Sequence, residues 1–341
     1  MLARVAEQIF WMSRYVERAL AVSRLVDVTL HLELDAGEDE HLDLWSPLLG
    51  PDAEHVLADA SIRADPAVAS AAVRHYLAVA PDNPNALVSC IRNARLAARG
   101  VRESISSEMW EQLNTLYLSV AEPPPAQHAE DDPHSLYRRV RESALAFQGL
   151  ADSTLAHGED WHFFSLGKYL ERADGVARLL TLQAHLLSPG AGGSTREDEA
   201  VRCLAVLRSC GCAEAYARYY SLRVEPARVI EFLLLNRIFP QSIRFSLNAA
   251  WHALEAIAEG EEHVATNAAV RRLGLLRASV DHAAVDEVLE AGLAAFLSSV
   301  QQRICEVADD VTRVYLRHES APERAMPVAR AAMLMAAQQQ Q

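Results

Sequence analysis

Residues 15–25 read Tyr-Val-Glu-Arg-Ala-Leu-Ala-Val-Ser-Arg-Leu, and residues 169–179 read Tyr-Leu-Glu-Arg-Ala-Asp-Gly-Val-Ala-Arg-Leu. Seven of the eleven positions are identical, at an offset of 154. Two further matches follow in the same order, namely Ala53-Glu54 with Ala213-Glu214, and 73–87 with 229–243. Three matches in order at a nearly constant offset indicate an internal duplication. We therefore expect two copies of one helical unit.

The residues around the first copy have the spacing of one long amphipathic helix. Apolar residues recur every three or four positions from Leu2 to Leu34, which is the period of an α-helix. The chain has 14 glycines and 14 prolines among 341 residues, and half of its residues are hydrophobic. A β-rich protein of this length needs more turn residues. We therefore predict an all-α fold, a helical bundle of long amphipathic helices in which the duplicated units have a pseudo-two-fold arrangement.

Breaks in the helical pattern divide the chain. Residues 121–133 contain three consecutive prolines and an acidic run, which cannot continue a helix. We predict a first helical repeat at 1–120, a Pro-rich acidic connector at 121–133, a second helical repeat at 134–320, and a C-terminal helix with a frayed tail at 321–341. Within the repeats, the pattern predicts uninterrupted helices at about 84–118, 197–220 and 282–318.

Charge and composition exclude several classes of protein. The net charge of −14 repels phosphate backbones and anionic lipid, so we expect neither nucleic acid nor a membrane as partner. No apolar stretch has the length of a signal-peptide core or of a membrane span. The five cysteines form an odd set without the spacing of a disulfide framework, which is typical of a reducing compartment. We therefore expect a cytoplasmic protein.

Charged residues form a stripe along the first predicted helix. Arg14, Glu17 and Arg24 are spaced by three and seven positions, so they share a face and Arg14 can pair with Glu17. A stripe of this kind is commonly a solvated salt-bridge face. The Tyr, the Glu and the arginines at 18 and 24 recur in the second copy, however, which favours a buried Glu-Arg network or a ligand site. The sequence leaves all three interpretations open.

A second stripe consists of arginines after Pro84. Four of them lie at spacings of three, four and three, and Ser106 follows one turn later: Arg92, Arg95, Arg99 and Arg102. Guanidinium groups favour bidentate contact with carboxylates or phosphates. The stripe is therefore either an anion site or the partner of glutamates inside the bundle, with Glu7, Glu17 and Glu171 as candidates. The polar segment 102–110 suits the wall of a cleft.

Familiar catalytic motifs are absent from the sequence. It has no Gly-rich phosphate-binding loop and no Gly-x-Ser-x-Gly. Cys210-Gly-Cys212 has no second pair and no neighbouring His, so it does not read as a zinc site. Glu-x-x-His occurs at Glu38/His41 and Glu159/His162, and the first pair falls in a predicted loop, whereas a di-iron bundle needs two such pairs on facing helices. We expect no metal and no cofactor.

Several stretches resemble one known family. Residues 101–110 read Val-Arg-Glu-Ser-Ile-Ser-Ser-Glu-Met-Trp, and residues 167–174 read Gly-Lys-Tyr-Leu-Glu-Arg-Ala-Asp. Together with 15–19, 83–84 and 232–242, they are similar to the bacterial alpha-E domain, also called DUF403, over essentially the whole chain. The resemblance implies an all-helical companion of a circularly permuted ATP-grasp ligase, with transglutaminase-like proteases and proteasome-like hydrolases as frequent neighbours. The implied setting is ATP-dependent amide-bond formation on a peptide or an amino acid.

The sequence departs from this family pattern at four positions. An Asp is expected where Ala80 stands, and Asn236 occupies the duplicate position. Leu96 and Ala97 replace a Glu and an Asn in the helix after Pro84. Such losses favour either a changed ligand preference or a site that has become partly structural.

Three hypotheses of function follow. The first is an accessory partner of an ATP-grasp amide ligase without independent activity, whose polar cleft holds a peptide, an acidic small molecule or a partner surface. The second is an enzyme that uses Glu17 or Glu171 as acid or base, and the third is a structural bundle that forms oligomers such as a homodimer. The candidate binding residues are Arg14, Tyr15, Glu17, Arg18, Arg24, Arg95, Arg99, Arg102, Ser106, Glu108, Trp110, Trp161, Lys168, Tyr169, Glu171, Arg172 and Arg178.

Overall fold

The described part of the chain is helical throughout. The computed structural model describes residues 1–37, 41–59, 62, 65–121, 134–182, 196–220, 224–259 and 267–316. These residues form helices and connecting turns and contain no strand, so the predicted all-α class is confirmed. Among these helices, none has both the length and the apolar character that crossing a membrane would require.

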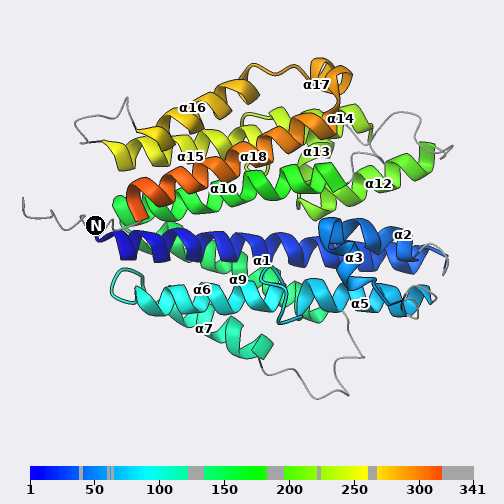
Figure 1. Ribbon diagram of the computed structural model, residues 1–341, viewed down its shortest axis with the longest axis horizontal. Coiled ribbons are helices and arrows are strands. Elements are labelled where there is room, and N and C mark those ends of the chain that lie inside the picture. The colour runs from blue at the N-terminus through cyan, green and yellow to red at the C-terminus, as the bar shows by residue number, and fades with distance from the viewer. Residues whose placement is uncertain are drawn as a thin grey trace, which may run out of the picture.

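Two groups of four long helices make up most of the molecule (Figure 1). The first group consists of α1 (Ala3–Asp35), α6 (Leu87–Gly100), α7 (Ser107–Ala121) and α9 (Ser135–Thr154). The second consists of α10 (Glu159–Leu182), α15 (Ile243–Ala258), α16 (Ala268–Asp281) and α18 (Leu293–Val311). In each group the first helix packs on the second and the fourth, and the third packs on those same two. This shared packing order is what a duplication would produce, although the duplication itself stays a prediction.

The boundary between the two groups differs from the predicted one. Helix α9 packs against α1 and α7, although we predicted that the second repeat begins at residue 134. The first group therefore ends after α9, and the second begins with α10 at Glu159. Sequence breaks mislead here because a Pro-rich stretch can interrupt a unit as well as separate two units. Most of the predicted connector, residues 122–133, and the predicted C-terminal helix and tail, 321–341, lie outside the described residues.

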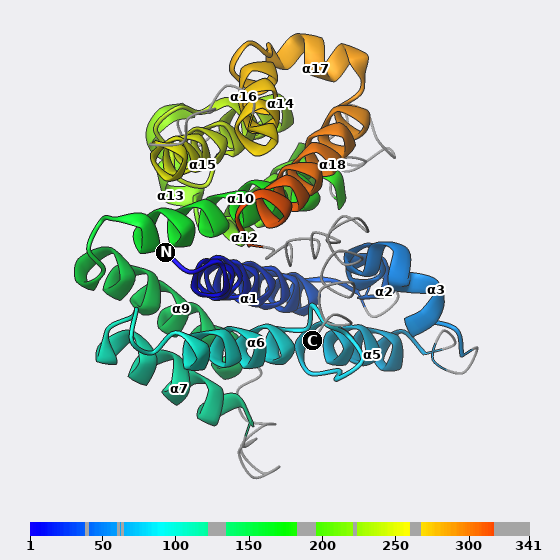
Figure 2. The same cartoon turned by 60° about the vertical axis from the view of Figure 1, so that its left-hand side comes forward.

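Helices α1 and α10 lie side by side at the centre (Figure 2). Both run in the same direction, and the N-terminal ammonium of Met1 contacts Glu159 at the start of α10 at 2.6 Å. On either side of this central pair lie the remaining long helices of the two groups. One hydrophobic core extends from α1 through α10 to α18, so the two groups share their interior.

Shorter helices cover one end of the central pair. In the first half they are α2 (His41–Trp45), η2 (Ser46–Asp52), α3 (Ala53–Val56) and α5 (Pro66–Ala78). In the second half they are α12 (Arg196–Ser209), α13 (Ala213–Tyr220), α14 (Pro226–Leu235) and α17 (Val285–Ala291). The π-helical turn η5 (Thr312–Leu316) follows α18 and lies at the opposite end, where Tyr315 packs on Phe163 near the start of α10. Segment η2 contacts α10, and α12 contacts α1. Each half therefore reaches across to the central helix of the other half.

Three predicted helices are broken, each for a local reason. Helix α6 ends at Gly100, and Ser106 caps a new helix, α7, because its Oγ accepts the backbone N–H of Met109 at 3.2 Å. Gly211 has φ 64° and separates α12 from α13. Gly292 has φ 104° and separates α17 from α18. Positive φ angles are easily adopted only by glycine, and a helical pattern with one glycine does not reveal them.

The two central helices come closest where one of them has a glycine. A Cβ atom at Gly167 would overlap the Oγ of Ser13 and the carbonyl oxygen of Phe10. Further along α10, a Cβ atom at Gly175 would lie 3.9 Å from the Cβ of Ala21, which is ordinary contact. Gly167 therefore sets the separation of α1 and α10, while Gly175 does not.

We expect Gly167→Ala to lower the free energy of unfolding by about 1–3 kcal/mol or more, because the added methyl group forces two packed helices apart. Gly175→Ala is the matched control on the same helix, and we expect it to be neutral or to stabilise by about 0.5–1 kcal/mol through helix propensity. Urea unfolding followed by circular dichroism measures both. Equal effects of the two substitutions would contradict the close approach at Gly167.

Candidate functional site

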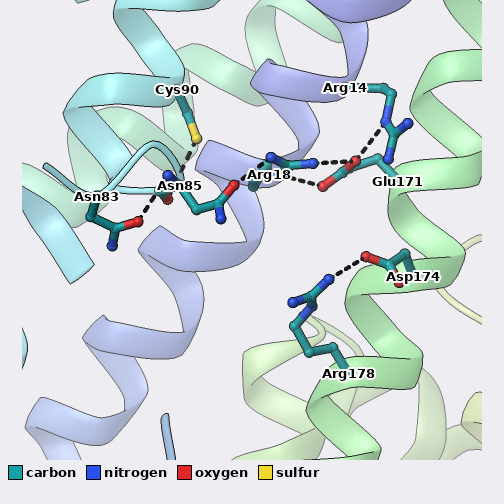
Figure 3. Close-up of polar contacts among 8 residues, drawn as sticks. All are labelled: Arg14, Arg18, Asn83, Asn85, Cys90, Glu171, Asp174 and Arg178. Carbon is teal, nitrogen blue, oxygen red and sulfur yellow. Dashed lines mark hydrogen bonds and ion pairs between the residues drawn. The ribbon is translucent and has the colours of Figure 1, made fainter. Parts of the chain in front are cut away.

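The two Glu-Arg motifs pair with each other across the central helices. The guanidinium group of Arg172 donates to Glu17 through Nε at 2.6 Å and through Nη2 at 2.9 Å. The guanidinium group of Arg18 donates to Glu171 through Nε at 2.5 Å and through Nη2 at 2.9 Å (Figure 3). Each glutamate therefore receives a bidentate contact from the other motif, the strongest geometry for such a pair.

Arg14 also reaches across the helices. The sequence suggested a pair with Glu17 on the same helix, but the Nε of Arg14 donates to Oε2 of Glu171 at 2.8 Å. Residues three positions apart share a helix face, yet a side chain on a buried face can contact the neighbouring helix instead. Glu171 consequently has two guanidinium partners, Arg14 and Arg18, and one positive charge there is not neutralised.

Polar groups from neighbouring helices complete the two pairs. Gln148 of α9 donates to Oε2 of Glu17 at 2.6 Å and accepts from Arg172 at 3.2 Å. Arg18 also donates through Nη1 to Oδ1 of Asn85 at 2.6 Å. In the second half, Nη1 of Arg172 lies 3.4 Å from the carbonyl oxygen of Pro240. Asn85 and Pro240 both lie just before the second long helix of their group, so the two pairs have corresponding surroundings.

Burial removes the solvated-face interpretation. Glu17 and Glu171 are 4% and 5% exposed, and Arg14 and Arg172 are each 7% exposed. Burial by itself raises the pKa of Glu171, but the charges and hydrogen bonds of Arg14 and Arg18 outweigh this and hold the pKa at about 2. Glu171 raises the pKa of Arg18 in turn, against the lowering effect of burial. Glu171 is therefore a permanent carboxylate at neutral pH.

A cavity of about 440 Å³ lies against the paired motifs. Its walls come from α1, α10, η2, the ends of α5 and α12, and the turns before α6 and α15. The lining cations are Arg14, Arg18, Arg24, Arg172 and Arg178, and the lining acids are Glu17, Asp52, Glu171 and Asp174. Leucines from both halves supply much of the apolar wall. This volume falls within the range of small-molecule sites.

Two groups in the cavity lack the partners that buried charges usually have. Half-buried Arg24 has no carboxylate within ion-pair distance among the described residues, and its Nη1 lies 3.4 Å from the carbonyl oxygen of Cys210. Burial lowers the pKa of Arg24. Asp174 is 5% exposed, and its Oδ2 accepts from Arg178 at 2.8 Å, whereas its buried Oδ1 has no hydrogen-bond partner among the described residues (Figure 3). Buried polar atoms are normally paired, so both groups suit a bound molecule.

The cavity contains seven of the predicted binding residues. The structure brings together Arg14, Glu17, Arg18, Arg24, Glu171, Arg172 and Arg178. It places the arginine stripe elsewhere: Arg99 and Arg102 are exposed, and Arg95 donates to Asn114 at 2.8 Å and stacks on Tyr117. The predicted pairing of this stripe with glutamates does not occur among the described residues. A helical wheel identifies the shared face of a stripe but not the element that it faces.

The remaining predicted residues have structural surroundings outside the cavity. Ser106 caps α7, and exposed Glu108 lies in the first turn of that helix. Trp110 packs beneath the guanidinium group of Arg102, at 4.8 Å. The others are Trp161, stacked on His157, Lys168, over the ring of Tyr169, and Tyr169 itself, packed on Phe245.

Tyr15 belongs to a separate groove between α1 and α6. This groove, of about 350 Å³, is lined by Glu7, Gln8, Trp11, Tyr15, Asn93, Leu96 and Ala97. Leu96 and Ala97 are the positions where the family pattern has Glu and Asn. Their replacement therefore changes the groove and leaves the central cavity unaffected.

The other two departures concern turns. Ala80 is buried, and Asn236 accepts the N–H groups of Ile238 and Phe239 at 3.0 and 2.8 Å. Asn236 thereby caps the turn between α14 and α15, as an Asp would. The loss of an acid at this position leaves its structural role in place.

The sequence reasoning missed several polar residues of the site. Asp174 directly follows the second motif, and this adjacency was the available signal. Gln148 gives no signal, because it lies on a helix without a recognisable motif. Asn85 and Gln241 each follow a proline that the duplication had aligned, so the alignment could have identified them.

The chain belongs to the Alpha-E family, described as a predicted alpha-helical domain with a conserved ER motif, whose model matches residues 1–316. Uncharacterized proteins of Mycobacterium bovis and of two strains of Mycobacterium tuberculosis are each 27% identical to it over 339 residues. These matches cover 92% of this chain and 37% of each relative, so the chain spans little more than a third of their length. No solved structure gives a significant match.

Proposed function

We propose that the chain is a binding protein whose central cavity holds an anionic ligand, and that it acts as the accessory partner of an ATP-grasp amide ligase in the cytoplasm. The observation that carries the ligand proposal is the uncompensated positive charge of the cavity. Within the described part of the chain Arg24 has no carboxylate partner, and Glu171 is shared by two guanidinium groups. A carboxylate or phosphate group of the ligand supplies the missing charge.

The buried cross-pairs and the unpaired groups have different roles in this proposal. Glu17 with Arg172 and Glu171 with Arg18 fix the register of α1 on α10, which needs no ligand. Arg24 and Asp174 are not needed for that register. A ligand that carries both an anionic group and a hydrogen-bond donor, such as an amino acid or a peptide end, satisfies both of them.

Acid–base catalysis by Glu171 is disfavoured. A general acid or base works best with a pKa near the working pH, whereas the pKa of Glu171 is about 2. The accessory role is therefore preferred over an independent enzyme. The ligase partnership rests on the family resemblance, and the amino-acid or peptide class of ligand agrees with it.

Titration calorimetry with glutamate and glutarate, against their diamide counterparts, which lack carboxylates, tests the ligand proposal. We expect the anions to bind and the diamides not to bind. Arg24→Gln should weaken anion binding by about tenfold or more, because a hydrogen bond to a charged group contributes about 1.5–3 kcal/mol. Arg99→Gln is the matched control, since Arg99 is exposed and lies outside the cavity. Equal binding by the two variants, or none by wild type, contradicts the proposal.

The ligase partnership has its own readout. Co-purification with a neighbouring ATP-grasp ligase, and ligase turnover with and without the chain, measure it directly. An unchanged turnover together with no association removes the partnership and leaves the ligand proposal standing.

A further inference from the structure

A second polar cluster lies on the C-terminal half of α1, outside the cavity. Asp27 and His31 are four positions apart on α1, so they share one face of the helix, and His134 precedes the first residue of α9. One candidate ligand atom from each of the three side chains lies within 4.8 Å of the other two. Asp27 is 7% exposed, His134 is half-buried and His31 is exposed.

The contacts around these side chains orient them toward a common point. The Nδ1 of His31 lies 2.7 Å from the carbonyl oxygen of Asp27, which favours a proton on Nδ1 and a lone pair on Nε2. Nη1 of Arg141 donates to Oδ2 of Asp27 at 2.9 Å, so Oδ1 is the oxygen that faces His134. The His31 and His134 ring centroids are 4.1 Å apart. A backbone carbonyl behind a histidine and a donor behind a carboxylate are the usual outer contacts of metal ligands.

We propose that Asp27, His31 and His134 bind a divalent first-row transition metal ion, with Zn²⁺ as the occupant. Two imidazole groups and one carboxylate form a donor set that suits zinc, and three protein ligands leave a coordination position open to water or to a ligand. Oδ1 of Asp27 and Nδ1 of His134 are 2.7 Å apart, the length of a hydrogen bond. The metal replaces that hydrogen bond and takes one lone pair from each of the two atoms.

The sequence could not reveal this cluster. Metal motifs in a sequence have short spacings such as Glu-x-x-His, and on that basis the sequence predicts no metal. The third ligand is separated from the first by 107 residues and is brought to α1 by the packing of α9. The site also lies apart from the central cavity, so its test is independent of the proposed ligand and ligase.

Titration of the full chain with Zn²⁺ by calorimetry, and with Co²⁺ by visible absorption, tests the proposal. Wild type should bind one ion at this cluster, and Co²⁺ should give the absorption of a four- or five-coordinate site with nitrogen and oxygen ligands. His31→Ala and His134→Ala should each weaken binding by at least about tenfold. His252→Ala is the matched control. His252 pairs with Glu255 at 3.5 Å and belongs to no group of three potential metal ligands among the described residues.

The alternative is a plain ion-pair cluster that joins α1 to α9. In that case wild type and the His31→Ala variant bind Zn²⁺ equally, and this result overturns the proposal. His31 is exposed, its Nδ1 contacts a carbonyl oxygen of its own helix, and its ring contacts the residue before α9, so its substitution leaves the helix α9 itself packed. The result therefore remains decisive even where the His134 variant fails to fold.

Discussion

Arg172→Met should lower the free energy of unfolding by about 3–5 kcal/mol, the largest loss we expect from a single substitution in the site. The substitution removes the bidentate partner of Glu17, which is 4% exposed and then keeps only Gln148. A buried carboxylate without a counter-ion is far more costly than a buried pair. Urea unfolding at neutral pH, followed by circular dichroism, gives the value.

Two further variants separate charge from packing. Arg99→Met removes an exposed guanidinium group that lies outside the cavity, so its loss should cost less than about 1 kcal/mol. The double variant Glu17→Leu with Arg172→Met should recover most of the stability, because well-packed apolar residues can replace a buried pair. A loss of stability in Arg172→Met no greater than that in Arg99→Met would show that the Glu17–Arg172 pair is not desolvated.

Acid should destabilise the protein through Glu171. The pKa of this carboxyl group is about 2 in the folded chain and about 4.5 in a free side chain, so the unfolded state takes up the proton first. The stabilisation is complete above about pH 4.5 and is lost as the pH falls toward 2. A depression of this size corresponds to about 3 kcal/mol. Unfolding free energies of wild type and Glu171→Gln, measured from pH 7 to pH 3, should differ most at pH 7 and converge in acid.

A matched control for the acid experiment is Glu108→Gln. Glu108 is exposed in the first turn of α7 and lies outside the cavity. This variant should follow the wild-type curve over the whole pH range. Parallel curves for wild type and Glu171→Gln would show that Glu171 titrates alike in the folded and unfolded chain.

The sequence predicts the central helices well because their apolar residues repeat over many turns. The helix expected from Leu2 to Leu34 is observed as Ala3–Asp35. The positions of Gly211 and Gly292 show where the prediction fails, since their φ angles depend on how the next helix packs. Periodicity describes one element at a time, and the packing that places α9 with the first group involves several elements.

The site could be predicted only in part. Recurrence of Tyr-x-Glu-Arg identified the glutamates and arginines that the structure brings together. It did not show that each glutamate pairs with the arginine of the other motif. Residue spacing does not reveal that Oδ1 of Asp174 lacks a partner among the described residues, because this depends on the three-dimensional surroundings of the side chain. The arginine stripe was predicted from the same kind of pattern and lies outside the cavity, because a stripe can equally cover the outside of a helix.

The crossed pairing of α1 with α10 has a consequence for how the chain folds during synthesis. Glu17 and its partner Arg172 are separated by 155 residues. Helix α1 leaves the ribosome before α10, so Glu17 stays without Arg172 until 155 further residues have been made. Helix α1 gains little stability before α10 is made, because the ion-pair partners of Glu17 and Arg14 both lie on α10. We infer that α1 and α10 reach their final packing together, after both have been made, rather than one after the other.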